Sequence, residues 1–119
     1  MNKFYNTNSF KLWSKLGQRA VFGLGMLEII KKHKDLIVVT ADVSTSAGLD
    51  RFRKNFPNNY IDCGIAEQNM MNIAAGLASE NFNVVTTSFA PFQTMRCLEQ
   101  IKVSLGYMKN KVTMVGLAS

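Results

Sequence analysis

Short apolar runs alternate with longer stretches of helical periodicity along this chain of 119 residues. The apolar runs lie at residues 36–40, 60–63, 84–88 and 112–117, and each predicts a strand. The first run is apolar almost throughout, which is typical of a strand that is buried on both faces. We therefore expect four strands, the first of them covered on both sides.

Apolar residues between these runs recur at spacings of three and four, the pattern of a helix with one buried face. We predict three long helices with the following apolar faces: Phe22, Met26, Ile29 and Ile30; Met70, Ile73, Ala74 and Leu77; Met95, Leu98, Ile101, Leu105 and Met108. Gly23 and Gly25 weaken the first helix and indicate close packing against a neighbour. The alternation predicts an α/β fold of three layers, with a mainly parallel sheet between helices on both faces.

The same pattern divides the chain into an N-terminal arm, residues 1–16, and one domain, residues 17–119. The arm lacks a clear period, so we expect either an extended segment or a short leading helix. A hydrophobic content of 47% suffices for one packed core. No linker or internal repeat interrupts the domain.

The net charge of +6 arises entirely from residues 1–34, where seven Lys and Arg face the single acid Glu28. Residues 35–119 hold seven charges of each sign. This excess predicts a solvated face and a favourable helix C-terminus around Lys31 and Lys32. It does not indicate a nucleic-acid site, because no interleaved aromatic residues or RNA-binding signature accompany it.

The two cysteines, Cys63 and Cys97, are far apart in the sequence and, with one histidine, form no zinc pattern. Free thiols in a reducing compartment are the simplest interpretation. No apolar leader and no apolar run of about 18 residues or more is present. We therefore predict a cytoplasmic protein that does not enter a membrane.

The candidate chemistry centres on residues 62–70, where Glu67 follows a predicted strand and Gly64 and opens a helix. A carboxylate in a first helical turn is stabilised by the helix dipole, which is one interpretation of Glu67. A second candidate is the hydroxyl-rich loop 41–48, at the carboxyl end of the first strand, where α/β sheets bind ligands. The alternative for this loop is a plain helix cap, with Ser44 or Ser46 as the N-cap.

Several motifs in one order carry a resemblance to a known family. The segments are 17–20 (GQRA), 40–43 (TADV) with Ser46, 56–57 (FP), 64–70 (GIAEQNM), 74–78 (AAGLA) and 88–92 (SFAPF), followed by Arg96 and 99–101 (EQI). Together they resemble the pyrimidine-binding domain of transketolases, especially the C-terminal subunit of the two-subunit kind. The resemblance covers residues 17–119 and implies a thiamine diphosphate-binding fold.

The resemblance also implies roles for individual residues. Glu67 matches the glutamate that bonds N1′ of the cofactor's aminopyrimidine ring, which helps the cofactor's own amino group to remove a proton. The implied cofactor-binding residues are Phe89 and Phe92, which would stack on the ring, and Asp42, which matches an acid near the cofactor. We expect Ile65, close to Glu67 in the sequence, to supply part of the apolar setting that the Glu67 carboxyl group needs. Arg19 and Ser46 match positions that contact the phosphate of a sugar phosphate. We expect Arg96 to be an ion-pair partner and not a ligand.

Two features of the family's pattern are missing from this sequence: the metal-binding motif and the C-terminal part of the domain. Transketolases hold Mg²⁺ and the diphosphate through an acidic motif that this sequence lacks, so no metal ligand is expected in this chain. The resemblance therefore implies a diphosphate-binding partner subunit, a homo-oligomer, or both. The family's domain normally continues beyond position 119, which predicts that the chain is incomplete at its C-terminus.

The expected activity is transfer of a two-carbon ketol unit between sugar phosphates, as in pentose phosphate metabolism. Two alternatives remain open. One is a fragment of an enzyme similar to deoxyxylulose-phosphate synthase, and the other is a non-catalytic domain that only binds a partner subunit.

Overall fold

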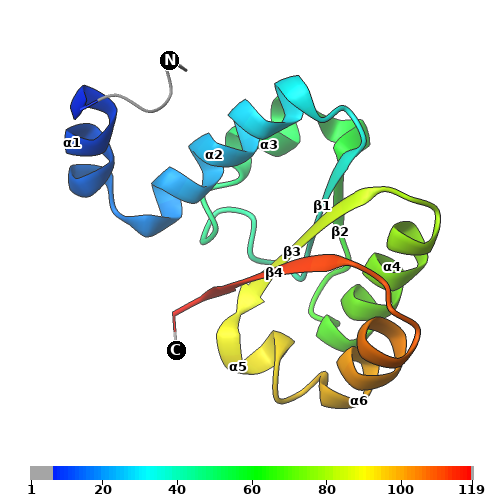
Figure 1. Cartoon of the computed structure of the whole chain (residues 1–119). Coiled ribbons are helices and arrows are strands. Elements are labelled where there is room, and N and C mark those ends of the chain that lie inside the picture. Colours follow the sequence, from blue (N-terminus) through cyan, green and yellow to red (C-terminus); the bar gives the residue numbers. More distant parts are fainter. Residues whose placement is uncertain (1–6, 119) are drawn as a thin grey trace.

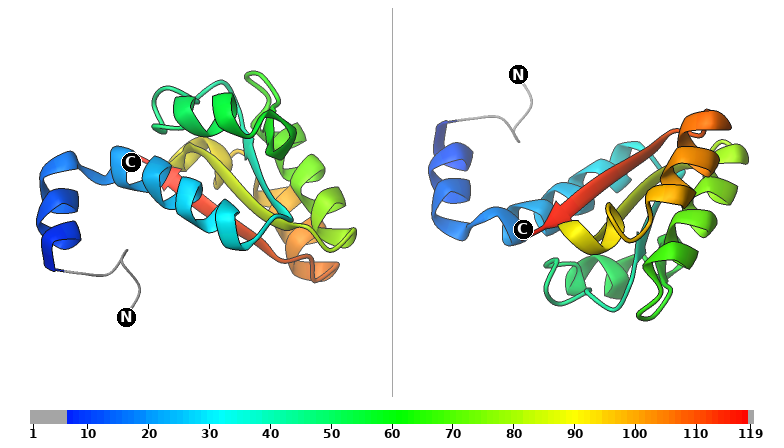
Figure 2. Two further views of the ribbon diagram at one scale, coloured as in Figure 1. Left: turned by 90° about the horizontal axis from the view of Figure 1, so that it is seen from above. Right: turned by 90° about the horizontal axis from the view of Figure 1, so that it is seen from below.

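A computed structural model describes residues 7–118 of the chain and contains one sheet with helices on both faces (Figure 1 and Figure 2). Its strands are β1 (Leu36–Thr40), β2 (Tyr60–Asp62), β3 (Asn83–Phe89) and β4 (Val112–Leu117). They are all parallel and lie in the order β2-β1-β3-β4. The predicted fold class and the four predicted strands are confirmed, each to within one residue.

The helices form two layers. Helices α2 (Gln18–Lys32) and α3 (Asp50–Asn55) cover one face, and the 3-10 turn η1 (Pro57–Asn59) leads from α3 into β2. Helix α4 (Glu67–Ser79) covers the other face together with α5 (Ala90–Gln93), α6 (Leu98–Gln100) and the π-helix η2 (Ile101–Tyr107). Helix α1 (Thr7–Leu16) lies apart from the sheet, beyond the start of α2 (Figure 1).

Strand β1 shows how the sheet separates two apolar cores. Its side chains alternate between the faces, since successive residues of a strand point to opposite sides. Leu36 and Val38 pack with the α2 and α3 side, whereas Ile37 and Val39 pack with the α4 side. All five residues of β1 are buried, as its continuous apolar run predicts. The central strand is therefore fixed on both faces, and its carboxyl end is a rigid support for the loop that follows.

The third predicted helix is wrong as a single element. Residues 90–107 form three short pieces instead of one helix, and the last piece has π-type hydrogen bonds, such as the amide of Met108 to the carbonyl of Val103 at 3.0 Å. A wider turn moves side chains at spacings of three and four off a common face. Met95 and Leu98 precede the π-helix, in the turn at residues 94–97 and at the start of α6, and this earlier break leaves them 80% and 67% exposed. Ile101, which begins the π-helix, is half-buried.

The two predictions for the N-terminal half have different outcomes. Residues 7–16 of the predicted arm form helix α1, and residues 1–6 lie outside the described part of the chain. The helix-cap interpretation of loop 41–48 is wrong, because Leu49 occupies the N-cap position of α3. Ser44 is buried instead, and its hydroxyl donates to Asp50 Oδ1 at 3.1 Å.

Among residues 7–118, no helix is both long and apolar enough to cross a bilayer.

Candidate functional site

The loops that follow β1, β2 and β3 meet at one edge of the sheet, because the carboxyl ends of parallel strands all lie on the same side. Asp42 stands in the first loop, residues 63–66 form the second, and Phe89 ends β3. Helix α2 runs antiparallel to β1, with only a short turn between them, so its first residues reach this edge as well. The topology thus gathers the sequence-predicted candidates at one edge of the sheet.

Asp62 joins the first two loops. Its Oδ1 accepts a hydrogen bond from the backbone N–H of Asp42 at 2.9 Å and another from that of Gly64 at 3.0 Å. The Tyr60 hydroxyl donates to Asp62 Oδ2 at 3.3 Å and lies 2.8 Å from Thr40 Oγ1. Burial raises the pKa of this hydroxyl, so it stays protonated and available as a donor.

Asp42 and Gly64 both adopt positive φ angles, of 55° and 67°, and Asp62 holds both turns. An aspartate that accepts from nearby backbone amides is a common way to fix such turns. The sequence motifs do not predict Asp62 as a site residue. The available signal was its position at the end of a strand, immediately before Cys63 and Gly64.

Glu67 is the first residue of α4 and is only 5% exposed. Its carboxylate is paired with Arg96, whose Nη1 lies 2.9 Å from Glu67 Oε2. Met70 and Met71, which follow on the same helix, are fully buried in the core beneath α4. Ile65 is 80% exposed, so it does not shield the carboxylate in this structure. The predicted role of Arg96 as an ion-pair partner is confirmed.

The two candidate stacking residues lie together but in different settings. The ring centroids of Phe89 and Phe92 are 5.9 Å apart with an edge-to-face geometry. Phe89 is half-buried and packs against the core on the α2 side, whereas Phe92 is 38% exposed. The guanidinium carbon of Arg96 lies 4.1 Å from the centroid of the Phe92 ring. The buried carboxylate and the exposed aromatic ring are therefore linked through one arginine.

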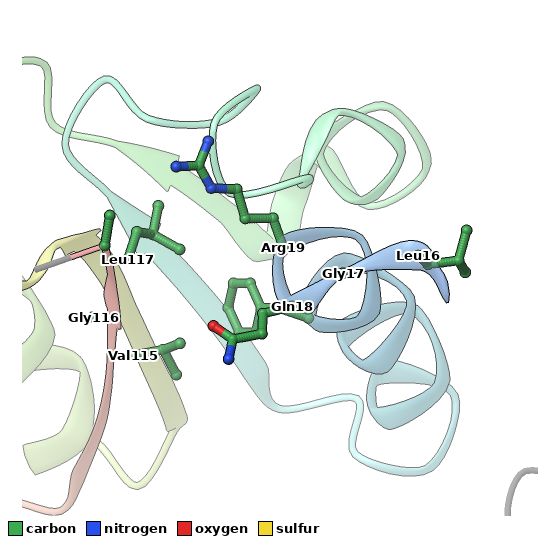
Figure 3. Close-up of a pocket in the computed structure, with 9 residues that line it drawn as sticks. Leu16, Gly17, Gln18, Arg19, Val115, Gly116 and Leu117 are labelled. Atoms are coloured by element: carbon green, nitrogen blue, oxygen red, sulfur yellow. The ribbon is translucent and has the colours of Figure 1, made fainter. Parts of the chain in front are cut away.

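Arg19 lies in a separate part of this edge. It lines a cavity of about 550 Å³ with Gln18 and Phe22, opposite the end of β4 at residues 115–118. Figure 3 shows Arg19 and Gln18 projecting from the start of α2 into the space between that helix and β4. The turn that carries Ser46 packs closely against the start of α2. The contact is so close that a Cβ added at Gly48 would lie 2.6 Å from the carbonyl oxygen of Arg19.

The two thiols of the site region have raised pKa values. Burial, and then the carboxylate of Asp62, raises the pKa of Cys63. Burial and the carboxylate of Glu67 raise the pKa of Cys97, and Arg96 offsets part of this effect. Both thiols are free, and the Cys97 thiol donates to the carbonyl of Phe92 at 3.2 Å.

We expect iodoacetamide to alkylate both cysteines slowly at pH 7.5 in the folded chain. A raised pKa leaves little thiolate at neutral pH, so the rate should increase as the pH is raised toward 9, and fully buried Cys97 should react last. Mass spectrometry of alkylated peptides measures both rates, and the chain unfolded in urea is the control. Equal rates for Cys97 in the folded and unfolded chain would contradict the burial described here.

The fold is a parallel α/β domain that gathers acidic and aromatic side chains at the carboxyl edge of its sheet. Residues 14–119 match the family model described as "Transketolase, pyrimidine binding domain". The chain therefore belongs to the transketolase family, as its pyrimidine-binding domain. Transketolases depend on thiamine diphosphate.

Over the aligned residues, the chain is between a third and two fifths identical to three curated relatives. It is 40% identical over 93 residues to an apulose-4-phosphate transketolase subunit of Phocaeicola vulgatus, covering 78% of this chain and 30% of that protein. It is 38% identical over 99 residues to a putative transketolase C-terminal section of Methanocaldococcus jannaschii, covering 83% and 31%. It is 36% identical over 99 residues to 1-deoxy-D-xylulose-5-phosphate synthase of Mycolicibacterium gilvum, covering 83% and 15%.

A solved structure confirms the fold. A split-gene transketolase, described as an inactive β4 tetramer, superposes with a TM-score of 0.74 at 34% identity. The match covers 82% of this chain and 33% of that one. The chain thus spans about a third or less of the length of these relatives.

Proposed function

We propose that this chain supplies the pyrimidine half of a thiamine diphosphate site in a transketolase that transfers a two-carbon ketol unit between sugar phosphates. The observation that carries the proposal is the buried carboxylate of Glu67, linked through Arg96 to the partly exposed ring of Phe92 at the edge of the sheet where α/β folds bind ligands. A ring nitrogen that shares a proton needs a carboxylate shielded from water, and an aromatic ring needs a flat apolar face.

The donor set fits only one end of this cofactor. Glu67 and Phe92 suit the aminopyrimidine ring, and Phe89 supports Phe92 from its edge. The diphosphate end requires a divalent metal, and the described residues contain no group of three or more His, Cys, Asp or Glu that would hold one. We therefore propose that Mg²⁺ and the diphosphate are held by a partner subunit. The relatives named as a transketolase subunit or as a C-terminal section support this division of the site.

Each candidate residue then has a distinct task. Glu67 would hold the proton shared with the ring nitrogen, and Phe92 would orient the ring. Asp42, fixed by Asp62, would close the side of the site nearest β1. When bound, thiamine diphosphate supplies the nucleophilic carbon for the transfer.

Substrate binding falls to the cavity between α2 and β4. We propose that Arg19 binds the phosphate of the sugar phosphate, assisted by Ser46, since a guanidinium donates two parallel hydrogen bonds to a phosphate. Arg19 is exposed at the start of α2, and the turn of Ser46 is packed against the same helix.

Calorimetry of cofactor binding tests the proposed half-site. We expect no heat when thiamine diphosphate and Mg²⁺ are titrated into the chain alone, and a saturable heat when the diphosphate-binding subunit that co-purifies with it is present. Titration of that subunit alone is the control. An absence of heat in the mixture, with the chain shown to be folded by circular dichroism, would refute the proposal.

A second candidate is a reaction like that of deoxyxylulose-phosphate synthases, which is favoured by the 36% identity to one such enzyme. The identity to the transketolase subunit is 40%, and the structural match is to a split-gene transketolase, so we place transketolase first. Assay of the assembled complex for ketol transfer from a ketose phosphate to an aldose phosphate separates the two, because only a transketolase carries it out.

A further inference from the structure

One arginine contacts both side chains that the proposed function assigns to the aminopyrimidine ring. Arg96 lies in the turn between α5 and α6, and its guanidinium reaches the first residue of α4. Its Nη1 is 2.9 Å from Glu67 Oε2, and its guanidinium carbon is 4.1 Å from the centroid of the Phe92 ring. The carboxylate and the ring come from different elements, so Arg96 fixes their positions relative to each other.

Both contacts leave room for a ligand. A carboxylate has two oxygens, and Arg96 bonds Oε2, so Oε1 is left to accept from a second donor. Phe92 keeps 38% of its surface exposed, and an aromatic ring stacked on one face still offers the other. Arg96 therefore has the geometry of a support behind the site, and its position does not exclude a planar ring from it.

The backbone of Arg96 is also held in place. The side chain of Gln68 donates from Nε2 to the carbonyl oxygen of Arg96 at 3.1 Å. Two adjacent side chains of α4 thus bond Arg96, the Glu67 carboxylate at the guanidinium and the Gln68 amide at the main-chain carbonyl. Two such bonds restrict the arginine more strongly than a single surface ion pair would.

Glu67 and Arg96 differ in burial, and this difference indicates that the ion pair orients the Glu67 carboxylate. Glu67 is 5% exposed, whereas the Arg96 side chain is 46% exposed. A buried carboxylate needs a partner to offset the loss of hydration, while a half-exposed guanidinium keeps much of its own hydration. The ion pair thus selects one orientation for Glu67 and leaves Arg96 anchored to the surface.

We propose that Arg96 is a positioning residue that holds the Glu67 carboxylate and the Phe92 ring in the geometry that receives the aminopyrimidine ring. This inference rests on the proposed function. It assigns to Arg96 no contact with the cofactor or the substrate, so its effect must pass through Glu67 and Phe92.

A double-mutant cycle on cofactor affinity tests this role. Thiamine diphosphate with Mg²⁺ is titrated by calorimetry into the assembled complex that carries Arg96→Met, Glu67→Gln or both. We expect Arg96→Met to weaken binding about tenfold when Glu67 is present and only about twofold in the Glu67→Gln background, because coupled residues are not additive. A residue that only stabilises the fold would show the same loss in both backgrounds.

Two further variants complete the design. Arg96→Lys is expected to recover part of the affinity, since an ammonium still pairs with the carboxylate but lacks the planar fork. Arg53→Met is the matched control, because Arg53 forms an exposed ion pair with Asp50 at 3.3 Å on α3, and it should leave the affinity unchanged.

The possible results are distinguishable. Cofactor binding by the unmodified complex, with no loss from Arg96→Met or with equal losses in both backgrounds, would overturn the role of Arg96 and leave the proposed function in place. No cofactor binding by the unmodified complex would overturn the proposed function and this inference with it.

Discussion

Replacing Glu67 by Gln is expected to lower turnover of the assembled complex by at least about a hundredfold, the usual range for loss of a proton-transferring group. Glutamine has the same shape but a neutral amide, so it cannot hold the shared proton of a ring nitrogen. Its amide oxygen still accepts from Arg96, which is half exposed and tolerates the loss of its counter-charge. Steady-state ketol transfer by the reconstituted complex measures the effect.

The fold and the assembly should survive this substitution. Size-exclusion chromatography of the mixed subunits checks assembly, and Glu80→Gln is the matched control, because Glu80 is exposed at the other end of the same helix. Unchanged turnover in Glu67→Gln would reject the catalytic role. It would favour the interpretation that this surface only binds a partner subunit.

Gly23→Ala is expected to destabilise the chain by about 3 kcal/mol, the upper part of the range for overpacking a core. A Cβ at position 23 would fall on the carbonyl oxygen of Gly48 and 2.9 Å from its carbonyl carbon. These are backbone atoms, so α2 and the turn before α3 must move apart. Gly48 itself has a φ of 70°, which resists any compensating change in that turn. Equilibrium urea unfolding followed by circular dichroism measures the loss.

Gly25→Ala provides the control within the same helix. A Cβ at position 25 meets nothing within 4 Å, so the alanine should stabilise α2 by about 0.5–1 kcal/mol through its higher helix propensity. Opposite signs for the two variants would support the close contact between α2 and the turn. Equal effects would show that the turn does not restrict position 23, contrary to the structure.

The local pattern predicted the strands well but failed for the segment after β3. The apolar run of β1 and the four strand positions follow from short-range periodicity, and they agree with the structure. The spacing of Met95, Leu98 and Ile101 indicated one helical face, yet the chain there is broken and ends in a π-helix. The break directs the side chain of Arg96 toward Glu67, a long-range contact that local spacing does not encode.

The prediction for the two glycines also separates what local sequence indicates from what long-range packing decides. Two glycines in the first helix indicated a close neighbour, and this is confirmed at Gly23 but not at Gly25. The sequence does not distinguish the two positions. A glycine indicates only that another segment of the chain can approach the helix closely, not that it does. Which glycine is contacted depends on where the turn at Gly48 crosses the helix.

By itself the sequence determined the parallel α/β fold and the family, and it made Glu67 the leading candidate, because periodicity and short motifs are local properties of the chain. Only the tertiary structure decided that Asp62 joins two loops, that Ile65 is exposed, and that Glu67 pairs with Arg96. The last pair is separated by 29 residues. Such partners are set by the order of the strands and by the packing of helices across them, so they emerge only when the whole domain is folded.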